Sequence, residues 1–133
     1  MDVQDYMKND LFAARNDIEL LKTGKGTASA KLTVKPHHLN AYRTLHGGAL
    51  FTLADFAFAA ACNSHGTVAV GINASMSYIK AVTEGEVIAE AEEVALGSKL
   101  SNYIVKVYQN KEIVAIFEGM AYRKKHVPLG SAG

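Results

Sequence analysis

One carboxylate and one pair of glycines stand where they could take part in the same chemistry. Asp55 lies within an apolar run that extends from Ala49 to Cys62. Burying an ionised carboxylate without partners costs several kcal/mol. Asp55 therefore either caps or pairs with a local group, or lies at a wet edge, or faces a pocket whose surroundings set its reactivity.

The glycine pair follows a histidine, in the order His46, Gly47, Gly48, just before the apolar run. Glycines at a helix start let the backbone approach a ligand closely, and the amides of the first helical turn have no acceptors within the helix. Such amides, aided by the helix dipole, suit a developing oxyanion. The alternative is a flexible loop followed by an ordinary helix start.

The spacing of these two features predicts that two subunits share one site. Gly47 and Asp55 are eight residues apart, which is roughly 12 Å along a helix. That distance is too long for both groups to address one carbonyl group. If both act on the same carbonyl, they come from different subunits, with two antiparallel helices related by a two-fold axis.

The elements that must position these groups can be read from the hydrophobic pattern. A long helix is predicted over 48–64, ended by Gly66, and a short one over 5–15. Alternating apolar and polar residues predict strands, with glycines or Asn110-Lys111 between them. The expected strands are 18–21 and 27–35, which form a hairpin, and then 68–78, 86–94, 102–108 and 112–122.

These elements indicate an α+β fold in which a curved antiparallel sheet of five or six strands wraps around one long central helix. The helix is apolar on nearly every side, so protein must surround it. The strand 113–122 is apolar on both faces, which favours a subunit interface. We expect a single domain over 1–133, with loose tails at 1–9 and 125–133.

Composition excludes several classes of function. Hydrophobic residues make up 49% of the 133 residues, charged residues 20%, and the net charge is +1. This balance excludes disorder and gives no overall field for nucleic acid or an anionic membrane. Cys62 is the one cysteine, and no zinc-ligand spacing occurs, so we expect no metal and a reducing, cytoplasmic setting. His37 and His38 are expected in a polar loop, with the remaining histidines, His65 and His126, exposed.

The segment from Asn40 to Asp55 reads N-A-Y-R-T-L-H-G-G-A-L-F-T-L-A-D and continues as F-A-F-A-A-A-C-N-S-H-G. It resembles the signature of the PaaI-type (phenylacetyl-CoA thioesterase-like) branch of the hotdog-fold thioesterases, over roughly residues 10–123. The resemblance implies a hotdog fold and hydrolysis of an acyl- or aryl-CoA thioester. It further implies a homodimer built into a homotetramer, and no cofactor besides the coenzyme A of the substrate.

The resemblance also implies roles for individual residues. Asp55 matches the general base or nucleophile, and Gly47 matches the glycine whose amide binds the carbonyl oxygen. Asn40 and His46 match polar residues that lie near that oxygen or shape the loop. Some relatives carry Ser or Thr where this chain has Gly71. The residues that could replace that hydroxyl are Asn73 and Ser75.

Other residues are candidates for holding the substrate. Those for coenzyme A or the substrate's polar groups are Gly48, Asn63, Lys80, Gly97, Ser98, Lys99 and Arg123. Those for the acyl group, with core packing as the alternative, are Tyr42, Phe51, Phe56, Phe58 and Tyr78. Two other functions stay open: an acyl-thioester hydratase or dehydratase of the same fold, and a non-catalytic acyl-CoA-binding module.

Overall fold

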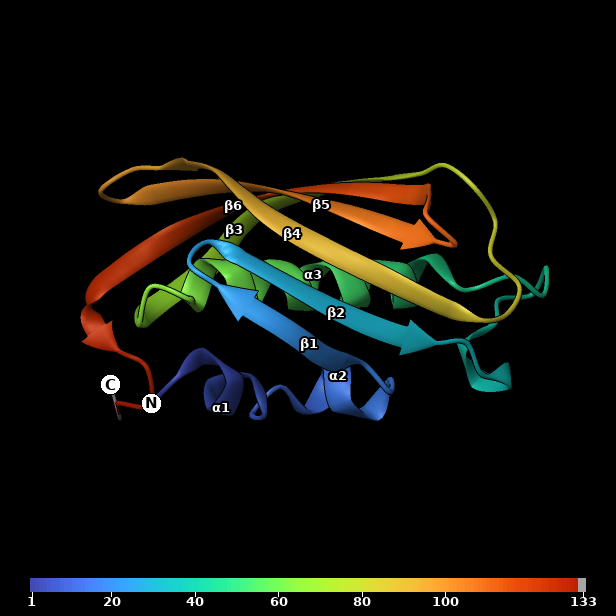
Figure 1. The fold of residues 1–133 in the computed structure, drawn as a ribbon, viewed down its shortest axis with the longest axis horizontal. Coiled ribbons are helices and arrows are strands. Elements are labelled where there is room, and N and C mark those ends of the chain that lie inside the picture. Colours follow the sequence, from blue (N-terminus) through green and yellow to red (C-terminus); the bar gives the residue numbers. More distant parts are fainter. Residues whose placement is uncertain (132–133) are drawn as a thin grey trace.

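The computed structural model describes residues 1–131 and shows one curved antiparallel sheet around one long helix (Figure 1). The order of elements along the chain is α1 Val3–Met7, α2 Leu11–Arg15, β1 Glu19–Gly24, β2 Thr27–Thr33, η1 Pro36–His38, α3 Gly47–Asn63, β3 Thr67–Tyr78, β4 Glu86–Leu96, β5 Leu100–Gln109 and β6 Glu112–Pro128. This confirms the predicted fold class. No helix among residues 1–131 is long and apolar enough to cross a membrane.

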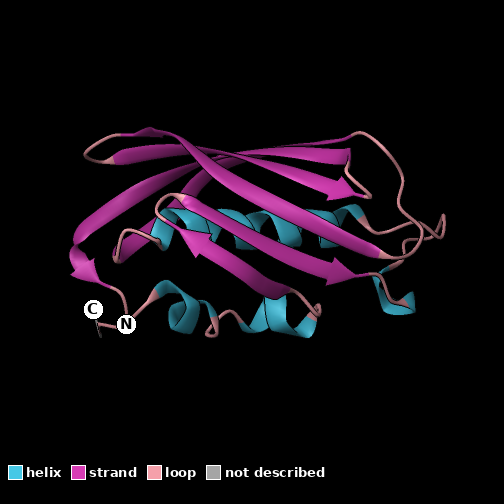
Figure 2. Cartoon of the chain, viewed as in Figure 1, coloured by secondary structure: helices cyan, strands magenta, loops and turns pink. Residues whose placement is uncertain are grey.

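The six strands follow the order β1-β2-β4-β5-β6-β3, and every neighbouring pair is antiparallel. Helix α3 lies in the hollow of the sheet, and α1 and α2 lie beside β1 (Figure 2). The alternation seen in the sequence faces the core: Ala28, Ala30 and Leu32 of β2 are buried against α3. The sheet thus covers one side of the helix.

Helix α3 is buried on most sides but keeps one open stripe. Leu53, Phe56 and Phe58 are buried, whereas Asp55 is exposed and Thr52 is partly exposed. Residues spaced three and four apart share a helix face, so the open stripe runs from Gly48 to Asp55. The sequence predicted that protein surrounds this helix, and along this stripe the sheet of the same chain does not cover it.

Strand β3 forms one edge of the sheet, and it departs from the predicted alternation. A bulge between Gly71 and Asn73 shifts its register against β6. Side chains alternate between the two faces of a strand. The extra residue in the bulge therefore reverses, for the residues after it, which side chains face α3. As a result Val70 and Ile72 are 40% and 53% exposed, whereas Ala69 is buried. A long edge strand with exposed apolar residues is suited to pairing with another strand.

The chain ends are more ordered than the sequence predicted. The helix expected over 5–15 is two helices, because the carboxylate of Asp10 caps α2 by accepting a hydrogen bond from Ala13 N at 3.0 Å. Residues 3–7 form α1, which buries Met7, and β6 continues to Pro128. Beyond β6, Leu129 is buried. Of the expected loose tails, residues 3–7 are therefore helix and residues 125–128 are strand, and residues 132–133 lie outside the described range.

Candidate active site

The start of α3 leaves a single backbone amide free. Gly48 N donates to His46 Nδ1 at 2.7 Å, and His46 O accepts from Ala49 N at 2.9 Å and Leu50 N at 3.1 Å. Of the first four helical amides, therefore, Gly47 N alone donates to no residue within the described chain. A free amide at the positive end of a helix dipole is suited to binding an oxyanion.

Tyr78, the last residue of β3, lies against this helix start. Its hydroxyl donates to Gly47 O at 3.1 Å. A Cβ atom at Gly47 would lie 3.2 Å from Tyr78 Cζ, so only glycine fits here without moving the ring. The sequence offered Tyr78 only as a possible acyl-pocket residue, because the two positions are 31 residues apart and no local pattern links them.

The loop before α3 is organised by Asn40. Its side-chain oxygen accepts from the amides of Tyr42 at 2.9 Å and Thr44 at 3.1 Å, and its amide group donates to Thr44 Oγ1 at 3.0 Å. Arg43 adopts a positive φ of 65° within this turn. Since both ends of the Asn40 side chain are occupied, the structure favours the loop-shaping role of Asn40 over contact with a substrate.

Asp55 lies two turns along the same helix, on the open stripe. Its carboxylate makes no hydrogen bond or ion pair with any of residues 1–131. Although it reaches solvent, surrounding protein removes enough water to raise its pKa, and the charge of Asp10 raises the pKa further. Among residues 1–131 no cation holds Asp55, so the charge that the sequence singled out is available for chemistry.

A small hollow lies beside the helix start. Its volume is about 220 Å³, and its lining includes Phe12, His46, Gly48 and Thr52. This is below the roughly 300–1,000 Å³ that ligand pockets usually offer. A larger hollow of about 500 Å³, lined by Lys22 and residues of β2, β4 and β5, contains none of the predicted catalytic residues. Only the smaller of these two hollows borders the helix start and the open stripe.

The chain is similar to known thioesterases. Residues 42–116 match the family model of the thioesterase superfamily. The chain belongs to this superfamily. It is 32% identical over 118 residues to acyl-coenzyme A thioesterase PaaI of Escherichia coli, with 87% of this chain and 84% of that protein covered. It is also 44% identical to a protein of Archaeoglobus fulgidus over 124 residues, 91% of this chain and 80% of that one.

Solved structures agree with this assignment. The PaaI protein of the Escherichia coli phenylacetic acid degradation operon matches with a TM-score of 0.84 and 30% identity, covering 92% of this chain and 96% of that chain. A mutant of the phenylacetic acid degradation protein PaaI from Thermus thermophilus matches with a TM-score of 0.83 and 36% identity, covering 86% of this chain and 99% of that chain. The protein is thus a PaaI-type hotdog thioesterase, and a thioester hydrolase.

In this thioesterase, a phenylalanine fills the space beside Gly71, the position where the resemblance implied a missing hydroxyl. A Cβ atom at Gly71 would lie 2.9 Å from Phe58 Cε2. Asn73 and Ser75 pair with Met120 and Glu118. Paired residues share a face, and this face points away from α3. The suggestion that Asn73 or Ser75 replaces the missing hydroxyl near Asp55 is therefore not supported within this chain.

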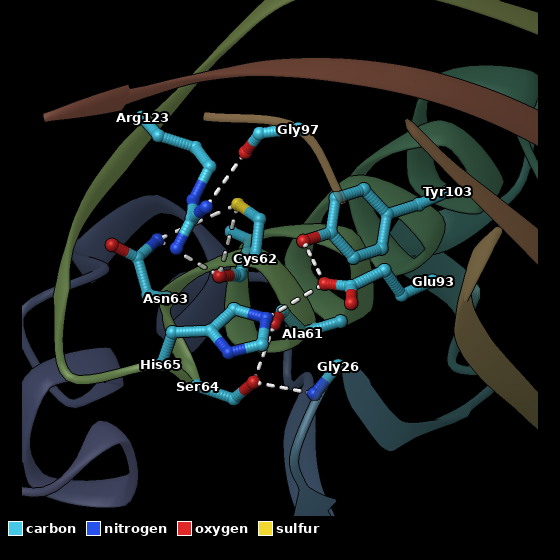
Figure 3. A network of polar contacts seen from close by, with 11 residues as sticks. Gly26, Ala61, Cys62, Asn63, Ser64, His65, Glu93, Gly97, Tyr103 and Arg123 are labelled. Atoms are coloured by element: carbon cyan, nitrogen blue, oxygen red, sulfur yellow. Dashed lines mark hydrogen bonds and ion pairs between the residues drawn. The ribbon is translucent and has the colours of Figure 1, made fainter. Parts of the chain in front are cut away.

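Five of the residues predicted to hold coenzyme A lie in two separate places. Arg123 contacts the turn between β4 and β5, where its guanidinium donates to Gly97 O at 2.7 Å (Figure 3). Its backbone N donates to Lys99 O at 2.7 Å. Ser98 and Lys99 are exposed in this turn. Lys80, by contrast, forms an ion pair with Glu112 elsewhere on the surface. Four of the predicted residues therefore lie together at this turn, namely Gly97, Ser98, Lys99 and Arg123. Lys80 lies elsewhere.

Asn63 is structural in the described chain. Its side chain is buried, donates to Ala59 O at 2.9 Å and Ala69 O at 3.2 Å, and accepts from Ala69 N at 2.9 Å. These bonds tie the end of α3 to β3. The placement of Asn63 among the substrate-binding residues is therefore not supported, because its polar atoms are already used.

A polar network continues from this end of α3 (Figure 3). Glu93 accepts from Tyr103 at 2.6 Å and pairs with His65 Nε2 at 2.7 Å. Burial alone would raise the pKa of Glu93, but the hydrogen bonds from His65 and Tyr103 outweigh it and lower that pKa. His65, predicted to be exposed, has a side chain only 11% exposed. The network anchors the helix end to the sheet.

His37, His38 and Asp17 form the one group of metal-ligand types that lie close together among residues 1–131. His38 was predicted to lie in a polar loop, but its side chain is buried. Its Nδ1 accepts a hydrogen bond from Lys35 N at 2.9 Å. Its Nε2 therefore carries the proton and faces Asn16 O at 3.1 Å. Burial lowers the pKa of His38, which keeps the ring neutral. With both nitrogens engaged, His38 has no lone pair for a metal, and we interpret the group as a hydrogen-bond cluster.

Proposed function

We propose that this protein hydrolyses acyl-CoA thioesters, with Asp55 and the Gly47 amide acting on the same carbonyl group. The observation that carries the proposal is the free Gly47 N–H at the start of α3, combined with an unpaired carboxylate farther along the same open stripe. Similarity to acyl-coenzyme A thioesterase PaaI supports coenzyme A as the thiol.

In the general-base form of the mechanism, Asp55 takes a proton from a water molecule whose oxygen attacks the thioester carbon. The carbonyl oxygen becomes an oxyanion that accepts from Gly47 N–H. Collapse of this intermediate breaks the C–S bond, and coenzyme A leaves as a thiol after taking up the proton. In the nucleophilic form, Asp55 attacks the carbon first, and the C–S bond breaks to release coenzyme A as a thiolate, which takes up a proton from solvent. Water then hydrolyses the resulting mixed anhydride to the free acid and restores the Asp55 carboxylate.

The proposal requires a homodimer. Eight helical residues separate Gly47 from Asp55 along α3, or roughly 12 Å, so the two groups of one chain cannot meet at one carbonyl. Pairing of β3 with β3 of a second copy would satisfy the exposed edge, bring in a second α3, and cover the open stripe. The resemblance to PaaI-type proteins further suggests a homotetramer of two dimers, and the single cysteine suggests a reducing, cytoplasmic setting.

The hydratase alternative fits the structure less well. Such chemistry pairs a His with an acid across the site. His46 Nδ1 is occupied by Gly48 N–H, which ties the ring to the helix start. A non-catalytic binding module would bind acyl-CoA without releasing a thiol. Release of free thiol from a panel of aryl-, phenylacetyl- and medium-chain acyl-CoAs distinguishes these functions, and no release from any of them would refute the proposal.

Complementation between two inactive variants tests the shared site. Asp55→Asn removes the carboxylate, and Gly47→Val forces a branched side chain against the Tyr78 ring. After unfolding and refolding together in equal amounts, half of the dimers are mixed, and each mixed dimer has one intact site of two. We expect about a quarter of wild-type activity from the mixture. If the mixture is as inactive as each variant alone, Gly47 and Asp55 do not act across subunits.

A further inference from the structure

We propose that Tyr78 is a positioning residue for the carbonyl-binding amide: its hydroxyl fixes the backbone at Gly47 so that the free N–H keeps one direction. This inference rests on the proposed function, because it gives the Gly47 amide the role of oxyanion donor. It gives a role at the helix start to Tyr78, which the sequence offered only as a possible acyl-pocket residue. The contact from Tyr78 to Gly47 O, at 3.1 Å, is the starting observation.

The peptide group between Gly47 and Gly48 is held at both of its polar ends. Tyr78 donates to its oxygen, and its N–H donates to His46 Nδ1 at 2.7 Å. Because a peptide group is planar, fixing the oxygen and the N–H fixes the plane. The residue that carries the free amide, Gly47, is thereby prevented from turning about its own ψ angle.

The neighbouring peptide group, between His46 and Gly47, carries the free N–H itself. Its oxygen accepts from Ala49 N and Leu50 N, so this end is also held. Two consecutive glycines would otherwise leave the helix start conformationally free. With Tyr78 in place, hydrogen bonds hold both the His46–Gly47 and the Gly47–Gly48 peptide groups. Of the polar atoms of these two groups, only the Gly47 N–H has no partner among the described residues. A donor arranged before the reaction stabilises a transition state more than one that must reorganise.

Tyr78 is well placed to act as a fixed support. It pairs with Ala115 of β6, and the two residues that follow it donate to Val114 O, at 2.8 Å from Ile79 N and 3.1 Å from Lys80 N. The end of β3 is therefore anchored to the sheet. The side chain is 54% exposed, so packing alone does not hold the ring; the hydrogen bond to Gly47 O does.

The test compares Tyr78→Phe with Tyr122→Phe on an acyl-CoA that the wild-type enzyme hydrolyses. Tyr78→Phe keeps the ring and removes only the hydroxyl. Loss of a whole oxyanion donor lowers kcat by about 100- to 1,000-fold, so loosening one should lower kcat by about 10-fold, with KM changed by less than about 2-fold. Tyr122 is 41% exposed, and its hydroxyl bonds to no residue of the described chain, so its replacement should change neither constant.

A second measurement separates positioning from general structural support. A trifluoromethyl ketone analogue of the acyl-CoA, which hydrates to a tetrahedral adduct, should bind Tyr78→Phe about 10-fold more weakly, while the affinity for free coenzyme A stays unchanged. Equal loss for both ligands, or a change in KM alone, would overturn the positioning role. So would a kcat for Tyr78→Phe equal to that of Tyr122→Phe. Absence of wild-type hydrolysis would instead refute the proposed function itself.

Discussion

Replacing Asp55 with Asn should change activity and stability in opposite directions. If Asp55 is the base or nucleophile, the amide of Asn cannot replace it, and kcat should fall by about 100- to 10,000-fold. Affinity for the substrate should change much less, because the size of the side chain is preserved. Release of free thiol from acyl-CoA, measured as a function of substrate concentration, separates the two effects.

The gain in stability follows from the direction of the pKa shift. Burial and the charge of Asp10 raise the pKa of Asp55 in the folded protein. A carboxyl group with a raised folded pKa destabilises the fold when it is ionised. That penalty is fully present above the folded pKa and vanishes below the unfolded value, which is about 3.9 for Asp. No described residue loses a partner on substitution, so nothing offsets the gain.

We therefore expect Asp55→Asn to raise Tm by about 1–3 °C at neutral pH and to leave it unchanged near about pH 3, where both proteins are neutral at this position. Calorimetry at the two pH values measures the difference. Glu118→Gln, at an exposed carboxylate on the outer face of the sheet, is the matched control and should affect neither turnover nor the pH dependence of Tm. A destabilised or fully active Asp55→Asn would show that Asp55 is a structural residue.

Three further results are expected. Asp10→Asn should move the acidic limb of kcat/KM to lower pH, because Asn caps a helix as well as Asp but no longer raises the pKa of Asp55; an unmoved limb contradicts this. Cys62, whose pKa burial raises to about 12, should react with iodoacetamide at least about 100-fold more slowly in the folded than in the unfolded protein. Gly119→Ala would place a Cβ 2.8 Å from Phe58 and should lower the free energy of unfolding by about 1–3 kcal/mol in urea titrations, with partial recovery when Phe58→Leu is added.

The central elements could be predicted because each has a local signal. The apolar run that contains Asp55 marks α3, and the alternation in 27–35 marks β2, which the structure shows over 27–33. The two-helix start could also have been found, since Asp10 precedes an apolar turn and Asp is a common N-cap. For these elements the sequence pattern and the packing agree.

The rest depends on contacts that no local pattern contains. The bulge in β3 reverses which residues face α3, and so turns Asn73 and Ser75 away from the helix. The open stripe that carries Asp55 could not be predicted, because a helix apolar on most sides does not reveal which side its own sheet leaves uncovered. The hydrogen bond from Tyr78 to Gly47 joins residues of different elements, and only the fold brings them together.

The packing of Phe58 against Gly71 constrains how such an enzyme could evolve. A hydroxyl residue at position 71 needs the space that the Phe58 ring occupies, so a chain that acquired Ser or Thr there first would carry an overpacked core. The substitutions are tolerated if a smaller residue first replaces Phe58 and Ser or Thr then replaces Gly71. Lineages of this family should therefore show correlated residues at these two positions, with an aromatic ring at one excluding a side chain at the other.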